Sequence, residues 1–403
     1  MRVLFFLPSL AGYWDRFRLL QEVSQGLEKM VLLVGNMDRE VDMDALTSAY
    51  PNFNLVPVRF AAGARFSNVR KASAMAESLI YEHSIQIAHD TFGNLLPLFK
   101  NRKHFPNLVC CTSFFILQGW RLRHVWHDLP WWKWFMNKSA WMVWYGAWIE
   151  KRLCHFSDYV VLQAPGLWDH LSEYVTISKT KLKVLPNNVD AEYWKPVAEK
   201  RDRGESKEIR ILFVGSLDQS RGLFVIIELI RKLLQEGIHA SLTLIGGWGL
   251  FAKEKTIRMI SEYGLQNHIH LRGRVKREEV LAAFRSHDLF LYQTINEGSP
   301  RIVLEAISTG IPVIASDHPG ILGLDLGKNF IRFTQFGDVE ALSLLVNEYL
   351  GNRDRFEFYS SVGREAVLQQ FSTPAVVKQY LELYREVTRR DGQCWERGKI
   401  INQ

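Results

Sequence analysis

Two glutamates, Glu297 and Glu305, lie eight residues apart around a stretch whose residue types suit the start of a helix. Ser299 predicts the N-cap of that helix, Pro300 suits its first position, and Gly310 predicts its end. The backbone N–H groups of a first helical turn lack partners, and the helix dipole favours an anion beside them. Glu305 would lie about two turns beyond Glu297, near the same face. Such residues can bind a ligand with an anionic middle and hydroxyls at both ends, as in a nucleotide sugar, although a capped helix with two solvated glutamates has the same spacing.

Buried strands are predicted on both sides of this stretch. Residues 289–292 are apolar and lead into it, and residues 311–315 form the next apolar run after it. The order strand, loop, helix, strand predicts that the loop lies at the carboxyl edge of a parallel sheet. This edge is where open α/β sheets place their ligands.

The stretch from Glu297 to Glu305 resembles the E-x7-E signature of retaining GT-B glycosyltransferases, the large family often numbered 4 and called glycosyl transferases group 1. The similarity extends downstream through residues 306–320. In that family the first glutamate contacts the transferred sugar and the second binds the ribose hydroxyls of the nucleotide. The resemblance therefore implies a catalytic place for Glu297 and a donor-binding role for Glu305. It also implies that the backbone from Gly298 through Ser299 to Pro300 faces the sugar and the phosphates.

The turn from Ser216 to Gly222 resembles the phosphate-binding turn of the same family, in which two basic residues clamp the diphosphate. Arg221 occupies the second basic position. Ser216 stands where the family usually has an arginine, which makes paired, charge-assisted bonds to phosphate that a serine cannot make. Either another cation such as Arg301 replaces it, or the affinity for the donor is lower. The alternative for Arg221 is an ordinary surface charge.

A strand predicted at residues 269–275 contains two further candidates, Gly273 and Arg274. The resemblance implies that the backbone at this glycine approaches the nucleobase of the donor. Both residues are therefore candidate donor-binding residues.

The first 150 residues alternate between predicted strands and helices, which is typical of a doubly wound domain. The predicted strands are 2–7, 30–34, 55–58, 85–88 and 108–111, and the predicted helices are 15–27 and 67–82.

This half contains three candidate site residues, of which His89 is a candidate catalytic residue and Gly12 and Tyr13 are candidates for the acceptor side. His89 would end the fourth strand at the carboxyl edge, where it can orient or bind a substrate hydroxyl, although a lone histidine there is more often structural. Gly12 and Tyr13 follow the first strand at the same edge, and the resemblance implies a place near the donor phosphates or the acceptor. Many relatives also carry a histidine after the next strand, where this chain has residues 112–114, Thr-Ser-Phe.

A chain of 403 residues is too long for one ordinary core, so two domains are expected. The fold class predicted is α/β, of the GT-B type, with two Rossmann-like doubly wound domains facing across a cleft. Residues 1–185 would form an acceptor-binding domain and residues 186–371 a nucleotide-sugar-binding domain. A C-terminal helix at about residues 372–403 would return to the first domain.

The composition, with 47% apolar and 23% charged residues, is that of a globular protein. The four cysteines include no C-x-x-C pair, which favours reduced thiols and a cytoplasmic protein. The apolar run at residues 3–7 is shorter than the core of a signal peptide and fits a first strand better. No stretch reaches the length of about 18 apolar residues that a membrane span needs.

The net charge of +7 is unevenly distributed. Residues 59–152 contain thirteen Lys and Arg but five Asp and Glu. Such an excess can meet nucleic acid, an anionic membrane or a phosphorylated acceptor. No nucleic-acid-binding motif accompanies it, so nucleic acid is not an expected partner.

Residues 120–148 contain eight of the thirteen tryptophans, with lysines interspersed. Tryptophan prefers the membrane–water interface, and lysine side chains can reach lipid headgroups from there. An anchor in the membrane plane is therefore expected, although a buried aromatic helix is the alternative. The candidate membrane contacts are Trp131, Trp134, Trp141, Trp148, Lys133 and Lys138.

The leading hypothesis is a retaining transferase that moves a sugar from a nucleotide-sugar donor to a membrane- or lipid-linked glycan acceptor. It would act without a metal or other cofactor, peripherally on the inner, cytoplasmic face of an anionic membrane. A second hypothesis is a catalytically weak nucleotide-sugar-binding protein that docks partners at the membrane. A third is a soluble transferase for a small metabolite, whose tryptophans only pack its core.

Overall fold

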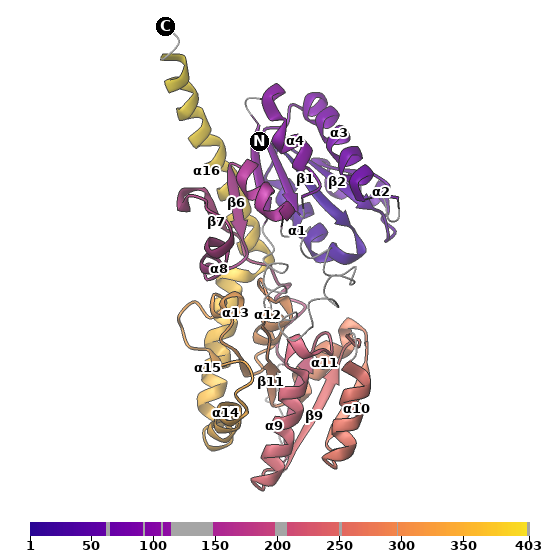
Figure 1. Cartoon of the computed structure of the whole chain (residues 1–403), viewed down its shortest axis with the longest axis vertical. Coiled ribbons are helices and arrows are strands. Elements are labelled where there is room, and N and C mark those ends of the chain that lie inside the picture. Colours follow the sequence, from indigo (N-terminus) through magenta and orange to yellow (C-terminus); the bar gives the residue numbers. More distant parts are fainter. Residues whose placement is uncertain are drawn as a thin grey trace, which may run out of the picture. The chain divides into compact units, whose positions relative to one another are not determined.

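The computed structural model describes residues 1–61, 65–91, 93–105, 108–113, 148–197, 208–249, 252–295 and 297–400 (Figure 1). These residues form two compact units, and each is described by itself. The N-terminal unit comprises Met1–Gln163, Leu167–Pro186 and Val376–Gln403, and the C-terminal unit comprises Ala164–Gly166 and Asn187–Ala375.

The N-terminal unit contains a seven-stranded parallel sheet with the order β3-β2-β1-β4-β5-β6-β7. The strands are β1 (Arg2–Ser9), β2 (Lys29–Asn36), β3 (Phe53–Pro57), β4 (Ile87–Thr91), β5 (Val109–Ser113), β6 (Tyr159–Leu162) and β7 (Leu182–Val184). The helices are α1 (Trp14–Gln25), α2 (Met43–Ala49), α3 (Arg65–His83), α4 (Leu96–Lys100), α8 (Leu167–Tyr174), a helix at residues 148–156, and most of α16 (Thr373–Ile400).

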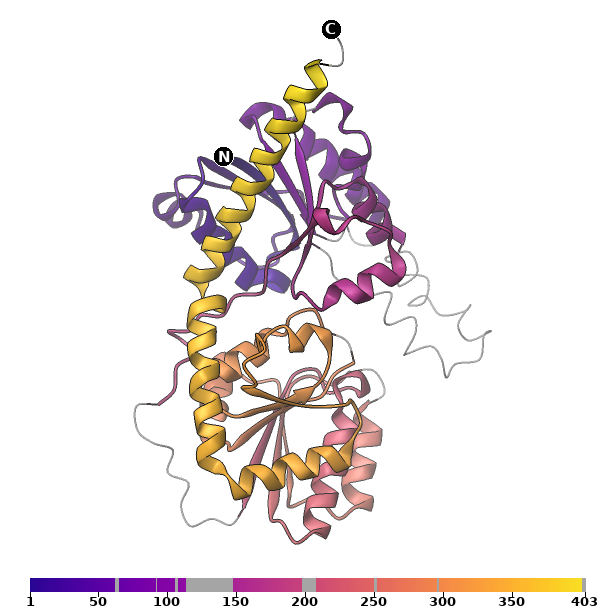
Figure 2. The same cartoon turned by 90° about the vertical axis from the view of Figure 1, so that its left-hand side faces the viewer.

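Helices cover both faces of this sheet because successive side chains of a strand point to opposite faces. Val3, Phe5 and Leu7 of β1 pack in the core that α1 and α16 complete. Leu4 and Phe6 pack in a second core with α3 and α4. Figure 2 shows α16 running along the strands of this unit. The predicted doubly wound arrangement of the first half is therefore confirmed.

The C-terminal unit contains a six-stranded parallel sheet with the order β10-β9-β8-β11-β12-β13. The strands are β8 (Ile209–Val214), β9 (Ala240–Ile245), β10 (Ile269–Gly273), β11 (Leu289–Tyr292), β12 (Val313–Ser316) and β13 (Ile331–Thr334). The helices are α9 (Leu223–Gln235), α10 (Ala252–Glu262), α11 (Arg277–Ser286), α12 (Arg301–Ser308), α13 (Pro319–Leu322), α14 (Val339–Gly351) and α15 (Arg353–Ala366).

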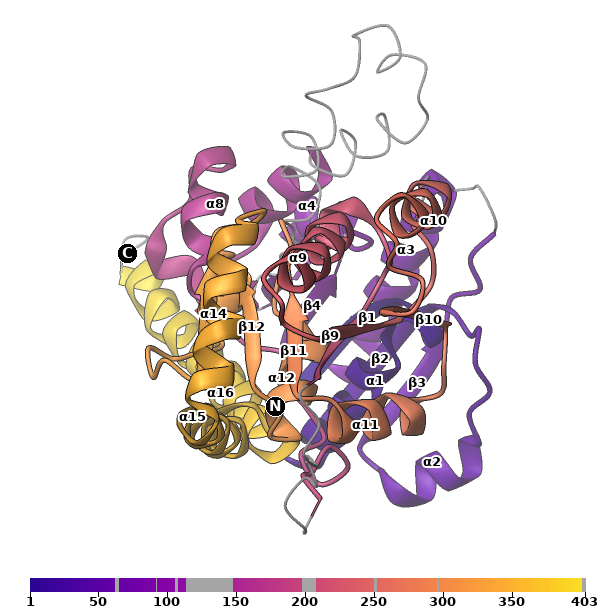
Figure 3. The ribbon, with the colours of Figure 1, turned by 90° about the horizontal axis from the view of Figure 1, so that it is seen from below.

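The central strands of this sheet are mostly apolar because helices bury them on both faces. Every residue of β11 is buried, and the buried residues of α9 recur at helical spacing, from Leu223 to Leu233. Figure 3 shows α9 and α10 on one side of β9 and β10, and α11 on the other. The expected second Rossmann-like domain is thus present.

In each sheet, an aspartate fixes the start of one strand by bonding a backbone N–H and an arginine side chain. Asp158, just before β6, accepts a hydrogen bond at 2.8 Å from the backbone N–H of Cys110 and contacts the Arg102 guanidinium. Asp288, just before β11, accepts from the backbone N–H of Arg210 at 2.9 Å and from the Nε and one terminal nitrogen of the same residue's guanidinium. Each carboxylate therefore ties its own strand to the neighbouring strand at the amino end.

One strand differs from its prediction in a way that matters for the site. β4 runs from Ile87 to Thr91, so His89 lies in the middle of the strand and not at its end. The imidazole is completely buried, packs 4.5 Å from the Phe5 ring, and lies 3.0 Å from the Tyr384 hydroxyl. Burial, helped by the charge of Arg16, lowers the pKa of His89 to about 3. His89 is therefore a neutral core residue in this unit, and its expected place at the carboxyl edge is wrong.

The next residue, Asp90, is also completely buried. One carboxylate oxygen accepts from the backbone N–H of Leu95 at 2.7 Å, and the other has no hydrogen-bond partner. Burial raises the pKa of Asp90 to about 7. An unfolded chain ionises this group near pH 4. Between those two values the unfolded state releases a proton that the folded state keeps, so Asp90 lowers the stability progressively as the pH rises.

Asp90→Asn should therefore stabilise the protein relative to wild type by an amount that grows with pH. The amide keeps an acceptor for Leu95 and removes the ionisation, which is worth about 1.4 kcal/mol per pH unit where the slope is full. From pH 5 to pH 8 the difference in unfolding free energy should shift by about 2–3 kcal/mol in favour of the variant. Urea unfolding of both proteins at the two pH values measures it.

His89 makes stability depend on pH in the opposite direction. Its pKa is lowered in the folded state, so the stability falls as the pH drops below about 6.5, where the unfolded chain takes up a proton. This contribution is common to both proteins and cancels in the difference. Asp169→Asn, at an exposed site, controls for the change in net charge. A stability difference that stays constant from pH 5 to pH 8 would contradict the assignment.

Candidate functional site

The carboxyl edge of the C-terminal sheet brings together two loops that are far apart in the sequence. After β8 the chain turns through a short 3₁₀ helix, η4 (Gln219–Arg221), into α9. After β11 it passes through residues 293–300 into α12. β8 and β11 are parallel neighbours, so both loops leave the sheet at the same edge. The predicted phosphate turn and the predicted E-x7-E stretch are therefore adjacent.

Three side chains from these loops contact one another directly. The Arg221 guanidinium forms an ion pair with Glu297 and also donates to the hydroxyl oxygen of Tyr292. The Tyr292 hydroxyl in turn donates to Glu297 Oε1 at 2.5 Å. The side chains of Arg221 and Glu297 are 24% and 14% exposed, so the carboxylate and the guanidinium stay within reach of a ligand. We refer to these three residues as the Arg–Tyr–Glu cluster.

The turn that carries Arg221 is built by local hydrogen bonds and a close backbone approach. Asp218 accepts from the backbone N–H of Arg221 at 3.2 Å and from the Ser220 hydroxyl at 2.5 Å. Gly222 has a φ of +69°, and a Cβ at this position would lie 2.3 Å from Gln293 Cβ. Only glycine therefore allows the turn to pack this closely against the residue after β11.

Buried polar side chains line the ends of three strands beneath the cluster. Ser316 Oγ accepts from the backbone N–H of Thr294 at 2.9 Å and donates to its carbonyl at 2.8 Å. Gln293 donates to the Thr334 hydroxyl at 3.2 Å. Sequence reasoning missed these four residues, although a signal exists, because each polar residue ends a strand or follows it within two residues. They fix the path of the chain that leads to Glu297.

The start of α12 differs from its prediction. Pro300 is the N-cap and Arg301 the first helical residue, whereas Ser299 makes no capping hydrogen bond. The Ser299 hydroxyl is buried without a hydrogen-bond partner, and its carbonyl accepts from the Asn187 side chain at 2.6 Å. The helix therefore starts later than expected, because proline already sets the backbone that a capping serine would set.

This shift changes the relation between the two glutamates. The loop from Glu297 to Pro300 is not helical, so Glu305 lies one turn inside α12 and not two helical turns beyond Glu297. Glu305 is half-buried. The pKa of Tyr193 is raised, mainly by burial, and the negative charge of Glu305 contributes to that increase. Gly298 lies against Gly320, where a Cβ would approach the Glu297 and Gly298 carbonyl oxygens to within 2.5 Å. The loop backbone is thus closely packed on one side.

The remaining donor-side candidates lie at the same sheet edge. Ser216 is exposed in the turn after β8. Gly273 ends β10 with a φ of +68°, and its carbonyl accepts from Gly246 N–H at 2.8 Å. Arg274 is exposed and packs over Gly247, where a Cβ would meet its guanidinium. Arg301 is half-buried at the start of α12.

The acceptor-side candidates belong to the N-terminal unit. Gly12 and Tyr13 lie in η1 (Ala11–Tyr13), directly after β1, where the backbone N–H of Gly12 donates to Ser9 Oγ at 3.2 Å. Burial raises the pKa of Tyr13 to about 12, so its hydroxyl stays protonated at neutral pH. These two residues are at the carboxyl edge of their own sheet, as expected.

The tryptophan-rich segment lies almost wholly outside the described residues. Trp131, Trp134, Trp141, Lys133 and Lys138 are among the residues that the structure does not describe. Trp148 is described, is 43% exposed, and has the Arg152 guanidinium 5.3 Å from its ring.

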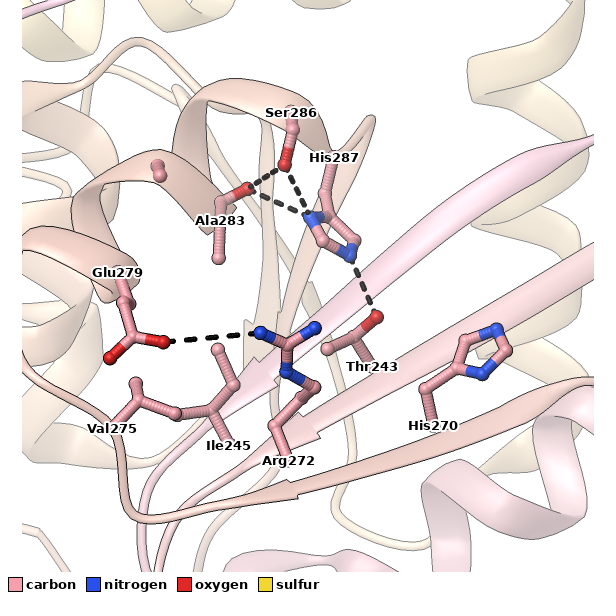
Figure 4. A pocket seen from close by; sticks show the side chains of 10 residues that line it. Thr243, Ile245, His270, Arg272, Val275, Glu279, Ala283, Ser286 and His287 are labelled. Atoms are coloured by element: carbon pink, nitrogen blue, oxygen red, sulfur yellow. Dashed lines mark hydrogen bonds and ion pairs between the residues drawn. The ribbon is translucent and has the colours of Figure 1, made fainter.

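A cavity of about 310 Å³ lies away from the Arg–Tyr–Glu cluster, between α11 and the face of β9 and β10 (Figure 4). Arg272 and Glu279 form an ion pair of 3.9 Å beside it, and His287 contacts the Thr243 hydroxyl at 2.8 Å. None of the predicted donor residues lines it. Both ring nitrogens of His287 are already paired, so this histidine packs α11 against the sheet.

Comparison with known sequences finds a family match within the C-terminal unit. Residues 197–366 match the family described as glycosyl transferases group 1. One relative, a putative colanic acid biosynthesis glycosyltransferase of Salmonella typhimurium, is 30% identical over 190 residues, which are 44% of this chain and 45% of that protein. The chain spans about half the length of the curated relatives it matches.

Solved structures match over nearly the whole chain. A sucrose-phosphate synthase from Thermosynechococcus elongatus superposes with a TM-score of 0.76 at 15% identity, covering 97% of this chain and 100% of that one. The Anabaena protein Alr3699/HepE, solved in complex with UDP and glucose, has a TM-score of 0.68 at 13% identity, covering 96% and 99%. At such identities the likeness shows the fold. The chain therefore carries a glycosyl transferases group 1 domain over residues 197–366, within a fold of the GT-B class.

Proposed function

We propose that this protein is a retaining glycosyltransferase that moves a sugar from a nucleotide-sugar donor to a lipid-linked or glycan acceptor. The observation that carries the proposal is the Arg–Tyr–Glu cluster, which joins the two motifs of the donor site at one sheet edge. The family match covers the residues that form this edge. The relative named for colanic acid biosynthesis supports an acceptor of the glycan type.

In the proposed reaction the bond between the anomeric carbon and the diphosphate oxygen breaks, and a bond to an acceptor hydroxyl oxygen forms on the same face. The acceptor hydroxyl gives its proton to the departing diphosphate oxygen, and the nucleoside diphosphate then leaves. Arg221 and the backbone N–H groups at the start of α12 stabilise the negative charge that develops on the diphosphate. Glu297 binds the sugar hydroxyls, and Glu305 binds the ribose. Gly298, Ser299 and Pro300 offer their backbone to the sugar and phosphates.

The nucleobase is proposed to lie against the backbone of Gly273 and Arg274, at the carboxyl end of β10. Ser216 faces solvent in the phosphate turn and leaves Arg221 as the cation on that turn. The Anabaena structure with UDP and glucose makes uridine nucleotides a reasonable first probe, together with guanosine and adenosine nucleotides. On the acceptor side, Gly12 and Tyr13 of the N-terminal unit are proposed to contact the acceptor.

We also propose that the segment 120–148 holds the protein peripherally on the inner, cytoplasmic face of an anionic membrane. Within the part of the chain that the structure describes, no helix combines the length and the apolar character needed to cross a membrane. The exposed Trp148 beside Arg152 supports an interfacial role, because an indole and a cation side by side suit the headgroup layer. The three described cysteines are buried free thiols, which suits a reducing compartment.

Two substitutions should separate the phosphate contact from the ribose contact. Arg221→Ala should weaken UDP, GDP or ADP binding by about 10- to 100-fold and leave binding of the matching nucleoside nearly unchanged, because it removes charge-assisted bonds to phosphate. Glu305→Ala should weaken the nucleoside and the diphosphate by similar factors, because the ribose is common to both. Isothermal titration calorimetry measures the affinity of the nucleoside and of the diphosphate for the wild type and both variants. The loss of affinity of each variant for each ligand is then compared.

Arg231→Ala on α9 removes a more exposed arginine that is also paired with a glutamate, and it serves as the control. Wild-type protein that binds none of the three diphosphates would contradict the proposed function. Equal losses for diphosphate and nucleoside in Arg221→Ala would remove the phosphate assignment. Donor hydrolysis by the wild type separates an enzyme from a catalytically weak binding protein.

The membrane proposal predicts binding to anionic liposomes that depends on both salt and tryptophan. High salt should release part of the protein, because exposed charges are screened. Replacement of Trp134, Trp141 and Trp148 with Ser should release more, because the interfacial apolar area is lost. Co-sedimentation with vesicles of phosphatidylglycerol and phosphatidylcholine measures the bound fraction, and a melting curve reports folding.

Trp168→Ser is the matched control, because Trp168 also lies beside a cation, Lys179 at 5.4 Å, but outside the segment. It should bind vesicles like the wild type. A triple variant that binds vesicles normally, or that unfolds, would favour a tryptophan segment that packs a core, as in a transferase of small metabolites.

A further inference from the structure

Tyr292 is the last residue of β11, and its side chain is almost completely buried. Its ring stacks against Phe213 of β8 at 6.4 Å and 13°, and against Phe290 at 6.0 Å and 23°. Two aromatic neighbours on adjacent strands hold the ring in one orientation. The position of the hydroxyl is therefore fixed by the sheet and not by a loop.

This hydroxyl uses both of its hydrogen-bonding capacities on the two charged residues of the site. It donates its proton to Glu297 Oε1 at 2.5 Å and accepts from the Arg221 guanidinium. A phenol has one proton to give and lone pairs to accept, so the two bonds are complementary and not in competition. Because both partners are ionised, the bonds are of the stronger, charge-assisted kind.

Packing alone does not require the hydroxyl. A phenylalanine would make the same ring contacts with Phe213 and Phe290 without burying a polar atom. The hydroxyl instead ties a long, flexible arginine and a glutamate on a loop to a rigid strand. A side chain that orders reactive groups before the ligand arrives reduces the entropy lost on binding.

We infer that Tyr292 is a positioning residue of the donor site, which holds the Glu297 carboxylate and the Arg221 guanidinium in register for a nucleoside diphosphate sugar. This inference rests on the proposed function. A guanidinium has five N–H donors, so Arg221 can keep its bond to Tyr292 while other donors turn to the diphosphate. Glu297 then remains anchored by the Tyr292 hydroxyl while it accepts from the sugar hydroxyls.

The same unit provides a matched control cluster. Tyr263, which follows α10, donates to Glu228 at 2.5 Å, and Arg231 lies 3.7 Å from Glu228 and 4.4 Å from the Tyr263 ring. The residue types are those of the Arg–Tyr–Glu cluster, and here too the tyrosine hydroxyl donates to a glutamate that is paired with an arginine. Tyr263 precedes the amino end of β10, however, so this cluster belongs to the opposite edge of the sheet.

The test compares Tyr292→Phe with Tyr263→Phe in the full chain. UDP, GDP and ADP binding is measured by calorimetry, and kcat and KM for donor hydrolysis are measured with the corresponding glucose or mannose nucleotides. Tyr292→Phe should lower kcat by about 10- to 30-fold and weaken the diphosphate by about 3- to 10-fold, as expected for lost bonds to charged groups. Tyr263→Phe should change neither, and both variants should melt close to the wild type.

A double-mutant cycle separates positioning from general stability. In the Arg221→Ala background, Tyr292→Phe should weaken the diphosphate no further, because its effect on binding passes through Arg221. Independent, additive losses would overturn the inference, as would a Tyr292→Phe variant that matches the wild type in kcat and affinity. In both cases the proposed function stands. A wild type that binds none of the three diphosphates would overturn the function and the inference together.

Discussion

The neighbouring positions of β8 and β11 are the constraint from which the candidate site follows. The two strands are separated by more than 70 residues of chain but pair in parallel. At the amino end, the Asp288 carboxylate bonds the backbone and the guanidinium of Arg210. At the carboxyl end, Gly222 packs against Gln293 at a distance that leaves no room for a side chain. The pair of strands is thus fixed at both ends. This brings the loops that carry Arg221 and Glu297 together, so that the two side chains form an ion pair.

The electrostatics of the edge follow from this geometry. A partly buried arginine and glutamate would each be costly alone, because ions lose hydration as water is excluded. Their ion pair offsets that loss, and the Tyr292 hydroxyl satisfies a further donor and acceptor. Below them, the Ser316 hydroxyl exchanges hydrogen bonds with the Thr294 backbone, which fixes the chain that leads to Glu297. The residues beneath the cluster are therefore held by hydrogen bonds, and the charged side chains of Arg221 and Glu297 lie above them, partly exposed.

The sequence contained most of this fold because central parallel strands are continuous apolar runs, and such runs are visible without a structure. Residues 289–292 were predicted to be a buried strand with the bounds that β11 has. The motif resemblance singles out Arg221 and Glu297, but it does not predict their contact with each other. Nothing in the local sequence marks Tyr292, because a tyrosine at the end of an apolar run reads as one more core residue.

The misplaced elements have a common physical origin, which is that strand and helix ends are set by partners and not by composition. His89 continues β4 because Phe5 and Tyr384 bury it, so a polar residue did not mark the end of the strand. Ser299 has the chemistry of an N-cap, yet Pro300 takes that place and the serine hydroxyl is buried without a partner. Pattern reasoning therefore places elements well and places their ends, where sites form, less well.

The pairing of Arg221 with Glu297 has a consequence for which ligand the proposed site favours. A free nucleoside diphosphate that takes Arg221 draws the guanidinium away from Glu297 and brings negative charge beside that carboxylate. An intact nucleotide sugar provides phosphate for the guanidinium and, at the same time, hydroxyl donors for the carboxylate. Ser216 adds no second cation on the turn to offset the repulsion. In the proposed reaction, the resting ion pair would therefore favour the complete donor over its diphosphate product, which would assist release of that product after transfer.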